Sequence, residues 1–288
     1  RRLRVGAPPI AGEHPIMSFA TTEAPFRFRQ GTQPLLISIP HMGTHVPPAL
    51  AARLTDEARG VPDTDWHLDR LYDFADALGA SVLQATHSRY VIDLNRPPDG
   101  ASLYPGQSVT GLCPIDTFDN TPLYRDPADL PTEAEIAARR DAIWHPYHAQ
   151  LRTELDRLRA AHGVAVLWDA HSIRSVLPRF FEGRLPDFNL GTADGASCDP
   201  ALAHTLHGIA EQASGYSAVL NGRFKGGYIT RQYGQPARGI HAVQLEQTQC
   251  SYMQEQPPFA YDEALAVQLQ APLKRMVGAA LDFALARR

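Results

Sequence analysis

Four short, mostly apolar runs in the sequence each lead into a side chain that can take part in chemistry. The runs and these side chains are 35–40 before His41, 90–94 before Arg96, 164–168 before His171 and 241–245 before Glu246. Runs of this kind are typical of strands that are buried on both faces of a sheet. Open α/β sheets carry their ligand sites beyond the carboxyl ends of such strands. We therefore expect the four side chains to meet in one site.

Two of these side chains are histidines, which suits a metal site. Catalytic zinc takes three protein ligands, commonly two His and one carboxylate, and keeps a fourth position for water. The carboxylate has two candidates, Asp63 and Asp65, at the start of a predicted helix, where N-capping is their alternative role. We favour Asp65 because it lies closer to the helix body. The prediction is one Zn²⁺ ion per chain, bound by His41, Asp65 and His171.

The metal prediction depends on convergence, because a lone buried histidine is more often a satisfied core residue. The sequence has no HExxH motif, so the site is not of that helical type. Reserve ligands, or partners that orient the ligands, are His45, His87 and Asp169.

Glu246 is the predicted general base. A carboxylate at the end of an apolar strand is costly unless it is paired or functional, although a surface position beyond the strand is the plain alternative. Near Zn²⁺, Glu246 could accept a proton from water and later pass it to a leaving amine.

Several cations and a glycine pair could bind an anionic ligand. Guanidinium groups match carboxylates in a bidentate geometry, and Arg96, next to Asn95, is the candidate least suited to a plain surface role. Gly226 and Gly227 could let backbone N–H groups approach a ligand, or could form only a turn. The predicted substrate-binding residues are Arg89, Asn95, Arg223, Lys225, Gly226, Gly227 and Arg231.

A nucleophilic mechanism has weaker support. Ser172 follows His171, but the GxSxG elbow of serine hydrolases is absent from the sequence. Cys113 and Cys250 lack the local signature of a catalytic thiol.

Predicted strands alternate with predicted helices, which indicates an α/β sheet with helices on both faces. The predicted strands are 26–31, 34–40, 81–84, 90–94, 164–169, 219–220 and 237–246. The predicted helices are 48–58, 62–78, 131–161 with a break near Pro146, 201–214 and 262–286. Two stretches rich in Pro and Gly, 97–131 and 173–200, are expected to form loops that cover the site.

The composition of the 288 residues, 44% hydrophobic and 20% charged, is that of an ordinary globular protein. The net charge of −4 gives no bias towards nucleic acid or membrane, and transmembrane runs are absent. Three scattered cysteines form no disulfide framework, which favours the cytoplasm. We interpret residues 1–16 as an N-terminal extension and 17–288 as a single domain. The oligomeric state stays open.

Seven segments together resemble the N-formylglutamate amidohydrolase (N-formylglutamate deformylase) family of histidine degradation. They are SIPHMGTHVP, DTDWHLDRLYDFADALGAS, SRYVIDLNRPPDG, LYPGQSVTGLCP, LWDAHSIRS, LNGRFKGGYITRQYG and GIHAVQLEQTQ. The family is similar in outline to zinc carboxypeptidases and aspartoacylases. The resemblance therefore implies a carboxypeptidase-like single domain with a mixed, mostly parallel central sheet. It also implies zinc-dependent hydrolysis of N-formyl-L-glutamate to formate and L-glutamate.

The resemblance implies roles for individual residues. His41 and His171 fit the two histidine ligands, and Glu246 fits the general acid/base. Carboxypeptidases carry their carboxylate ligand three residues after the first histidine, where this chain has Thr44. This departure is why the carboxylate is placed at Asp65.

Arg96 fits the arginine that such enzymes use for the substrate or for the charge on its oxygen. The resemblance offers Arg223, Lys225 and Arg231 as partners of the two glutamate carboxylates and does not choose among them. Two other functions stay open: a metal-dependent deacylase of another N-acyl amino acid, and a non-catalytic carboxylate-binding relative. The second would require an incomplete metal set.

Overall fold

The computed structural model describes residues 19, 21–103 and 106–287, so the predicted extension 1–16 lies outside the described residues. The strands are β1 Phe26–Arg29, β2 Leu35–Ile39, β3 Ser81–Ala85, β4 Ala165–Ile173, β5 Phe188–Gly191, β6 Ala218–Leu220 and β7 Ile240–Thr248. The helices are α1 Pro48–Ala51, α2 Asp56–Arg59, α3 Leu68–Leu71, α4 Glu133–Arg139, α5 His145–His162, α6 Pro200–Glu211, α7 Tyr228–Tyr233 and α8 Glu263–Leu285. None of these helices is long and apolar enough to cross a membrane.

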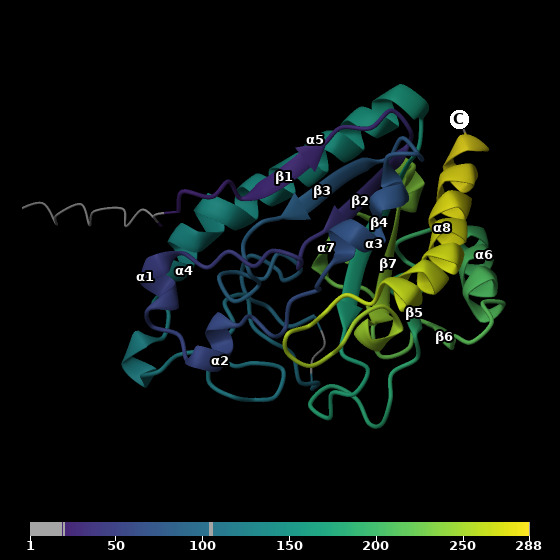
Figure 1. Cartoon of the computed structure of the whole chain (residues 1–288). Coiled ribbons are helices and arrows are strands. Elements are labelled where there is room, and N and C mark those ends of the chain that lie inside the picture. The colour runs from purple at the N-terminus through teal and green to yellow at the C-terminus, as the bar shows by residue number, and fades with distance from the viewer. Residues whose placement is uncertain (1–18, 20, 104–105, 288) are drawn as a thin grey trace, which may run out of the picture.

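One sheet of seven strands runs through the molecule in the order β1-β3-β2-β4-β7-β5-β6 (Figure 1). The strands β3, β2, β4 and β7 are parallel, whereas β1 and β5 pair antiparallel with β3 and β7. The two central strands, β4 and β7, have nine residues each, all buried. The prediction of a mixed, mostly parallel sheet is confirmed.

Helices cover both faces of the sheet, as predicted (Figure 1). Alternate residues of β2 divide between two core clusters, because successive side chains of a strand point to opposite faces. Leu35 and Ile37 pack in the cluster that α3, α6 and α8 complete. Leu36 packs in the cluster that includes Leu151 and Leu155 of α5. Both faces of the strand are therefore covered by core side chains, which is why its sequence is mostly apolar without alternation.

The buried run 90–94 is not a strand, which corrects one prediction. Its backbone forms local turns: the Val91 N–H donates to the Ser88 carbonyl at 2.9 Å. Side chains also take backbone partners, since the N–H groups of Tyr90 and Asn95 donate to Ser88 Oγ and Asp93 Oδ1. Short polar side chains compete with the sheet ladder in this way. The segment is buried as a folded loop.

Several helix predictions were too long or were missed. The predicted helix 62–78 contains only α3 and the 3₁₀ segment Asp73–Ala75, because His67 adopts a left-handed φ of 60° before α3. The predicted helix 48–58 divides into α1 and α2. The break near Pro146 is confirmed as a π-helical segment, Arg140–Trp144, between α4 and α5. Strand β5 lies within the predicted loop 173–200, and α7 carried no prediction.

A buried histidine of α5 supports the loop 88–96. His148 Nε2 donates to the Leu94 carbonyl at 2.8 Å, and Nδ1 lies 2.9 Å from Tyr233 Oη. The His148 ring stacks on Trp144, with 3.7 Å between the ring centroids. Burial lowers the pKa of His148 from 6.5 to about 3. The ring is therefore neutral in the folded protein at neutral pH.

This lowered pKa predicts a loss of stability in acid. Because the unfolded chain takes up the proton first, neutral His148 stabilises the fold fully above pH 6.5, and this contribution is lost as the pH falls towards 3. Below about pH 6, the free energy of unfolding of the wild type should fall more steeply than that of His148→Gln, by up to about 1.4 kcal/mol per pH unit. Urea unfolding at several pH values measures both slopes.

The exposed His204 of α6 provides the control. His204→Gln should keep the slope of the wild type. Equal slopes for the wild type and His148→Gln would contradict the prediction.

Candidate functional site

The site lies where β2, β4 and β7 end, on the face of the sheet that α5 covers. Asp169 and His171 of β4 point to the same face as Leu167, which packs in the core cluster beneath α5. In the parallel register of β4 and β7, His171 lies opposite Glu246. The strands thus place two predicted site residues side by side.

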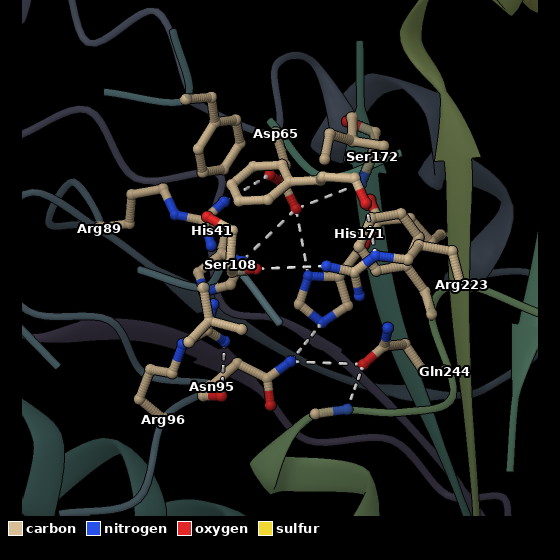
Figure 2. Close-up of a pocket in the computed structure, with 17 residues that line it drawn as sticks. His41, Asp65, Arg89, Asn95, Arg96, Ser108, His171, Ser172, Arg223 and Gln244 are labelled. Carbon is tan, nitrogen blue, oxygen red and sulfur yellow. Dashed lines mark hydrogen bonds and ion pairs between the residues drawn. The ribbon is translucent and has the colours of Figure 1, made fainter. Parts of the chain in front are cut away.

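A pocket opens at these strand ends and encloses about 590 Å³, including its mouth (Figure 2). Small-molecule sites usually have volumes of this order. The wall combines histidines and carboxylates with three arginines and three phenylalanines. The lining residues are His41, Asp65, Arg89, Asn95, Arg96, Ser108, Val109, Phe118, His171, Ser172, Ile173, Phe180, Arg223, Phe224, Gly227, Gln244 and Glu246.

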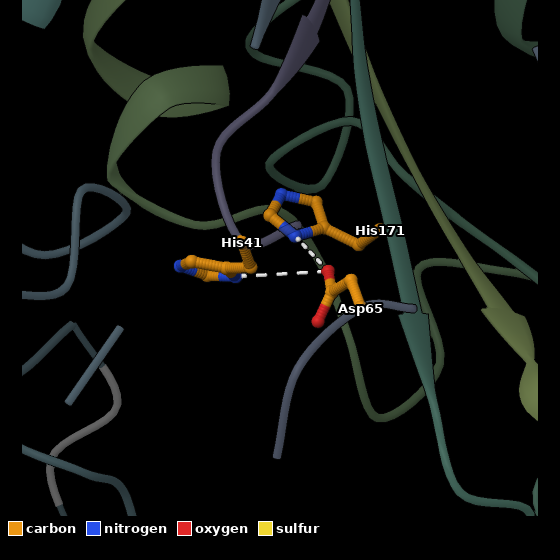
Figure 3. A group of neighbouring side chains, drawn as sticks. All are labelled: His41, Asp65 and His171. Carbon is orange, nitrogen blue, oxygen red and sulfur yellow. Dashed lines mark hydrogen bonds and ion pairs between the residues drawn. The ribbon is translucent and has the colours of Figure 1, made fainter. Parts of the chain in front are cut away.

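Three buried side chains of this wall, His41, Asp65 and His171, form a compact cluster (Figure 3). Asp65 Oδ2 lies 3.2 Å from His171 Nδ1 and 3.8 Å from His41 Nδ1. The Asp65 N–H donates to the His41 carbonyl at 3.0 Å, which joins the two loops directly. Each of the three residues offers one possible metal-ligand atom, and these atoms lie within 4.8 Å of one another. Two imidazole nitrogens and a carboxylate oxygen at this spacing are a donor set that suits zinc.

The other ring nitrogen of each histidine faces a second buried carboxylate. His41 Nε2 lies 2.7 Å from Asp93 Oδ1, and His171 Nε2 lies 3.1 Å from Asp169 Oδ2. Asn95 Nδ2 is also 3.1 Å from His171 Nε2, so the ring tautomer decides which partner engages. Metal-binding histidines usually donate one N–H to a carboxylate and keep the other nitrogen for the metal. Both histidines have this arrangement.

The two histidines differ in their preference for a proton. Burial lowers the pKa of His41, and Arg89 adds to this effect, although Asp93 opposes it. Burial also opposes a charge on His171, but Asp169 and Asp65 raise its pKa well above the usual value. His171 therefore lies in a negative field that attracts a cation.

Glu246 has an environment suited to proton transfer. Its side chain lines the pocket and the residue is 8% exposed. Burial and the charge of Asp65 raise the pKa of Glu246 to about 8, although His171 acts in the other direction. A carboxyl group with a pKa near neutrality can both accept and release a proton, as a general acid–base group must.

The three arginines of the wall are held by neighbouring groups. Arg89 Nη2 lies 2.9 Å from Asp93 Oδ2. Arg96 Nε donates to the Thr110 carbonyl at 2.8 Å, and Arg223 Nε donates to the Phe180 carbonyl at 2.6 Å. In Figure 2, Arg89 and Arg96 lie to the left of His171, and Arg223 reaches in from the right, where its Nη2 donates to the Ser108 carbonyl at 3.3 Å. The pocket wall thus carries positive charge near the cluster.

Three predicted binding residues do not line the pocket: Lys225, Gly226 and Arg231. Lys225 Nζ lies 3.1 Å from Asp194 Oδ1, and its side chain is 40% exposed. Arg231 Nε donates to the Gly226 carbonyl at 2.9 Å. The structure brings together with the cluster the predicted binding residues Arg89, Asn95, Arg96, Arg223 and Gly227.

The reserve candidates have other partners. Asp63 Oδ2 accepts from Tyr90 Oη at 2.5 Å and from a backbone N–H at 2.8 Å. Neither Asp63 nor Asp65 caps α3, which begins without a side-chain cap. His45 and His87 pack against each other, with 4.9 Å between ring centroids, and neither lines the pocket.

Asp93 and Gln244 contact predicted site residues, although the sequence predicted a role for neither of them. Asp93 contacts His41 and Arg89, and a carboxylate within an apolar run was the available signal. Gln244 Oε1 accepts from the Gly227 N–H at 2.8 Å. It lies two residues before Glu246, so the strand period would have placed it on the same face.

Known proteins resemble this chain over most of its length. The N-formylglutamate amidohydrolase family profile matches residues 33–253. The N-formylglutamate deformylase of Pseudomonas putida is 56% identical over 254 residues, which are 88% of this chain and 94% of that protein. The N-formylglutamate deformylase of Pseudomonas aeruginosa is 56% identical over 250 residues, 87% of this chain and 93% of that protein.

Two solved structures share the fold. The crystal structure of N-formylglutamate amidohydrolase from Ralstonia eutropha JMP134 has a TM-score of 0.75 and 27% identity, and the match covers 91% of this chain and 97% of that chain. The gene product Atu2144 from Agrobacterium tumefaciens has a TM-score of 0.66 and 21% identity, over 90% and 96% of the two chains.

Gly227 allows the close approach that fixes Asn95 in the pocket. A Cβ at position 227 would overlap the Asn95 amide, although the Gly227 φ of −85° is open to any residue. Asn95 is not free to move, because its Oδ1 accepts from the Ile229 N–H at 2.8 Å and its Nδ2 contacts His171. Any side chain here must therefore displace a buried, hydrogen-bonded group.

Gly227→Ala should consequently lower the free energy of unfolding by about 1–3 kcal/mol, the usual cost of overpacking. Gly278→Ala in α8, where an added Cβ meets nothing within 4 Å, is the matched control. It should be neutral or stabilising by up to about 1 kcal/mol, because Ala favours helices. Urea unfolding measures both variants, and an unaltered Gly227→Ala protein would refute the packing argument.

Proposed function

The chain belongs to the N-formylglutamate amidohydrolase family, and from this premise we propose that it hydrolyses N-formyl-L-glutamate to formate and L-glutamate with one bound Zn²⁺ ion. The single observation that carries the proposal is the His41–Asp65–His171 cluster at the base of a pocket with arginines in its wall. The place of the reaction in histidine degradation stays a prediction.

The residues present fit a zinc ion. The Nδ1 atoms of both histidines face Asp65, while their Nε2 atoms face Asp93 and Asp169. With the proton on Nε2, the tautomer in which each ring donates to its carboxylate, each ring keeps its Nδ1 lone pair for a metal. The ligands are therefore His41, Asp65 and His171, and the bound ion would supply Lewis acidity that lowers the pKa of water and polarises a carbonyl.

Glu246 transfers the proton in this proposal. Its carboxyl lines the same pocket and lies on the strand next to His171. Burial is the main cause of the raised Glu246 pKa, and the Asp65 charge adds to it. A cation at Asp65 would offset the Asp65 contribution and itself favour the carboxylate form of Glu246. Glu246 accepts a proton from the attacking water and then donates it to the amide nitrogen as glutamate leaves.

The pocket arginines bind and orient the dianionic substrate. Arg223 lies in the pocket wall and is the residue that we assign to a substrate carboxylate (Figure 2). Arg96 is the group that we assign to the charge on the formyl oxygen. Asn95 and Arg89 hold the nearby histidines through direct contact or through Asp93. Contacts of Lys225, Gly226 and Arg231 with the substrate stay predictions.

The purified protein should release formate from N-formyl-L-glutamate. Release should fall after chelation of metal and return when Zn²⁺ is added, because the ligand cluster would lose and regain its ion. A coupled formate assay, together with metal analysis of the same sample, measures both effects. N-acetyl-L-glutamate is the matched substrate control.

Two results would contradict the proposal. Turnover of the acetyl but not the formyl substrate would favour a deacylase of another N-acyl amino acid. Formate release by a protein that metal analysis shows to be free of metal would exclude the metal mechanism.

Glu246→Gln should lower kcat by roughly 10²–10⁴-fold, the usual contribution of a general acid–base group. Bound zinc should stay near one ion per chain in this variant, because Glu246 is outside the ligand cluster. Glu211→Gln, at an exposed position of α6, is the control and should keep full turnover. Unchanged turnover of Glu246→Gln would remove Glu246 as the base.

A further inference from the structure

Asp65 lies in a stretch without regular structure, residues 60–67 between α2 and α3. Besides its contact with His171, Asp65 has two hydrogen bonds to the backbone: its N–H donates to the His41 carbonyl at 3.0 Å, and its Oδ2 accepts from the Ser172 N–H at 3.2 Å. Figure 2 shows Ser172 next to the Asp65 carboxylate. A ligand on such a loop needs further support to keep its direction.

That support comes from the segment that follows β7. Gln249 Nε2 donates to the Thr64 carbonyl at 2.9 Å, and Tyr252 Oη donates to the Trp66 carbonyl at 2.8 Å. These are the peptide carbonyls of the residues on either side of Asp65. Two side chains almost two hundred residues away in sequence therefore hold the Asp65 loop at both flanks.

Ser172 connects the two supports. Its Oγ lies 2.8 Å from Tyr252 Oη and 3.3 Å from Gln249 Nε2. Tyr252 Oη and Gln249 Nε2 both donate to Ser172 Oγ, so this oxygen accepts from both supports. Gln249 has two N–H groups, one for Thr64 and one for Ser172, and the Tyr252 hydroxyl is shared between Ser172 and the Trp66 carbonyl. Ser172 thus joins the two side chains that hold Thr64 and Trp66.

We propose that Gln249, Ser172 and Tyr252 form a clamp that positions Asp65 as a metal ligand, an inference that rests on the proposed function. All three are buried, with 3%, 2% and 0% exposure, so water cannot easily replace a lost partner. The clamp also gives Ser172 a positioning role, because its Oγ accepts from Gln249 and Tyr252 while its backbone N–H donates to Asp65. Outer partners of metal ligands typically contribute 10–100-fold to metal affinity.

Tyr252→Phe removes the hydroxyl that joins Trp66 to Ser172. Zinc affinity, measured by competition with a chromophoric chelator, should fall by roughly 10–100-fold. The matched control is Tyr72→Phe, which removes another buried hydroxyl. Tyr72 Oη accepts from Trp168 Nε1 at 2.9 Å, and neither residue lines the pocket of the site. That variant should keep the zinc affinity of the wild type, even if it unfolds more easily.

A second variant guards against simple loss of the fold. Gln249→Met keeps the length of the side chain but removes both donors, and it should weaken zinc binding in the same direction. In an Asp65→Asn background, Tyr252→Phe should have little further effect, because the clamp acts through Asp65.

The outcomes separate the two proposals. Wild-type protein that binds zinc, with unchanged affinity in Tyr252→Phe and Gln249→Met, would overturn the clamp alone. Wild-type protein that binds no zinc would overturn the proposed metal site and the clamp with it. Weaker binding in both variants, with Tyr72→Phe unaffected, would support the clamp.

Discussion

The site depends on the burial of several carboxylates in a small space at the ends of β2, β4 and β7. Asp65, Asp93 and Asp169 are each no more than 1% exposed, and Glu246 is 8% exposed. Arg89 pairs with Asp93 among them. Buried charge is costly unless it is balanced, so this excess of carboxylates over buried guanidinium favours the uptake of another cation. The orientation of the two histidine rings decides where that cation binds.

The same charge distribution orients an anionic substrate. The centre of the pocket carries buried carboxylates, whereas the arginines of the wall are positive. A small core cluster of Phe118, Ile173, Leu177 and Leu185 packs the loops of this wall together, with Phe180 and Phe224 against it. Loop carbonyls in turn hold the arginine side chains. In the proposed reaction, the substrate carboxylates would stay at the arginines, and the neutral formyl amide would approach the His41–Asp65–His171 cluster.

The sequence predicted the parts of the site that lie on or directly after strands. His171 and Glu246 followed from apolar runs, and the register of β4 and β7 brings them together. The prediction of a strand at 90–94 was wrong because the side chains of Asp93 and Ser88 accept hydrogen bonds from the local backbone. An apolar, buried run alone does not distinguish a loop from a strand. The supporting contacts of Asp65 carried no local signal. They join residues on β4 and beyond β7 to a loop before α3, so only the tertiary structure reveals them.

This long-range construction also links the proposed metal site to folding. The proposed ligands come from three separate places in the chain, and Gln249 and Tyr252 of the clamp come from a fourth, so none of the site exists in the unfolded chain. A ligand that binds only the folded state adds its binding free energy to stability, about 2.7 kcal/mol at a free concentration 100 times Kd. Here a bound metal would stabilise the contacts that connect the Asp65 loop to β4 and to the segment after β7. The metal would thus hold the centre of the sheet to the loop before α3, and the clamp would be the contact through which it does so.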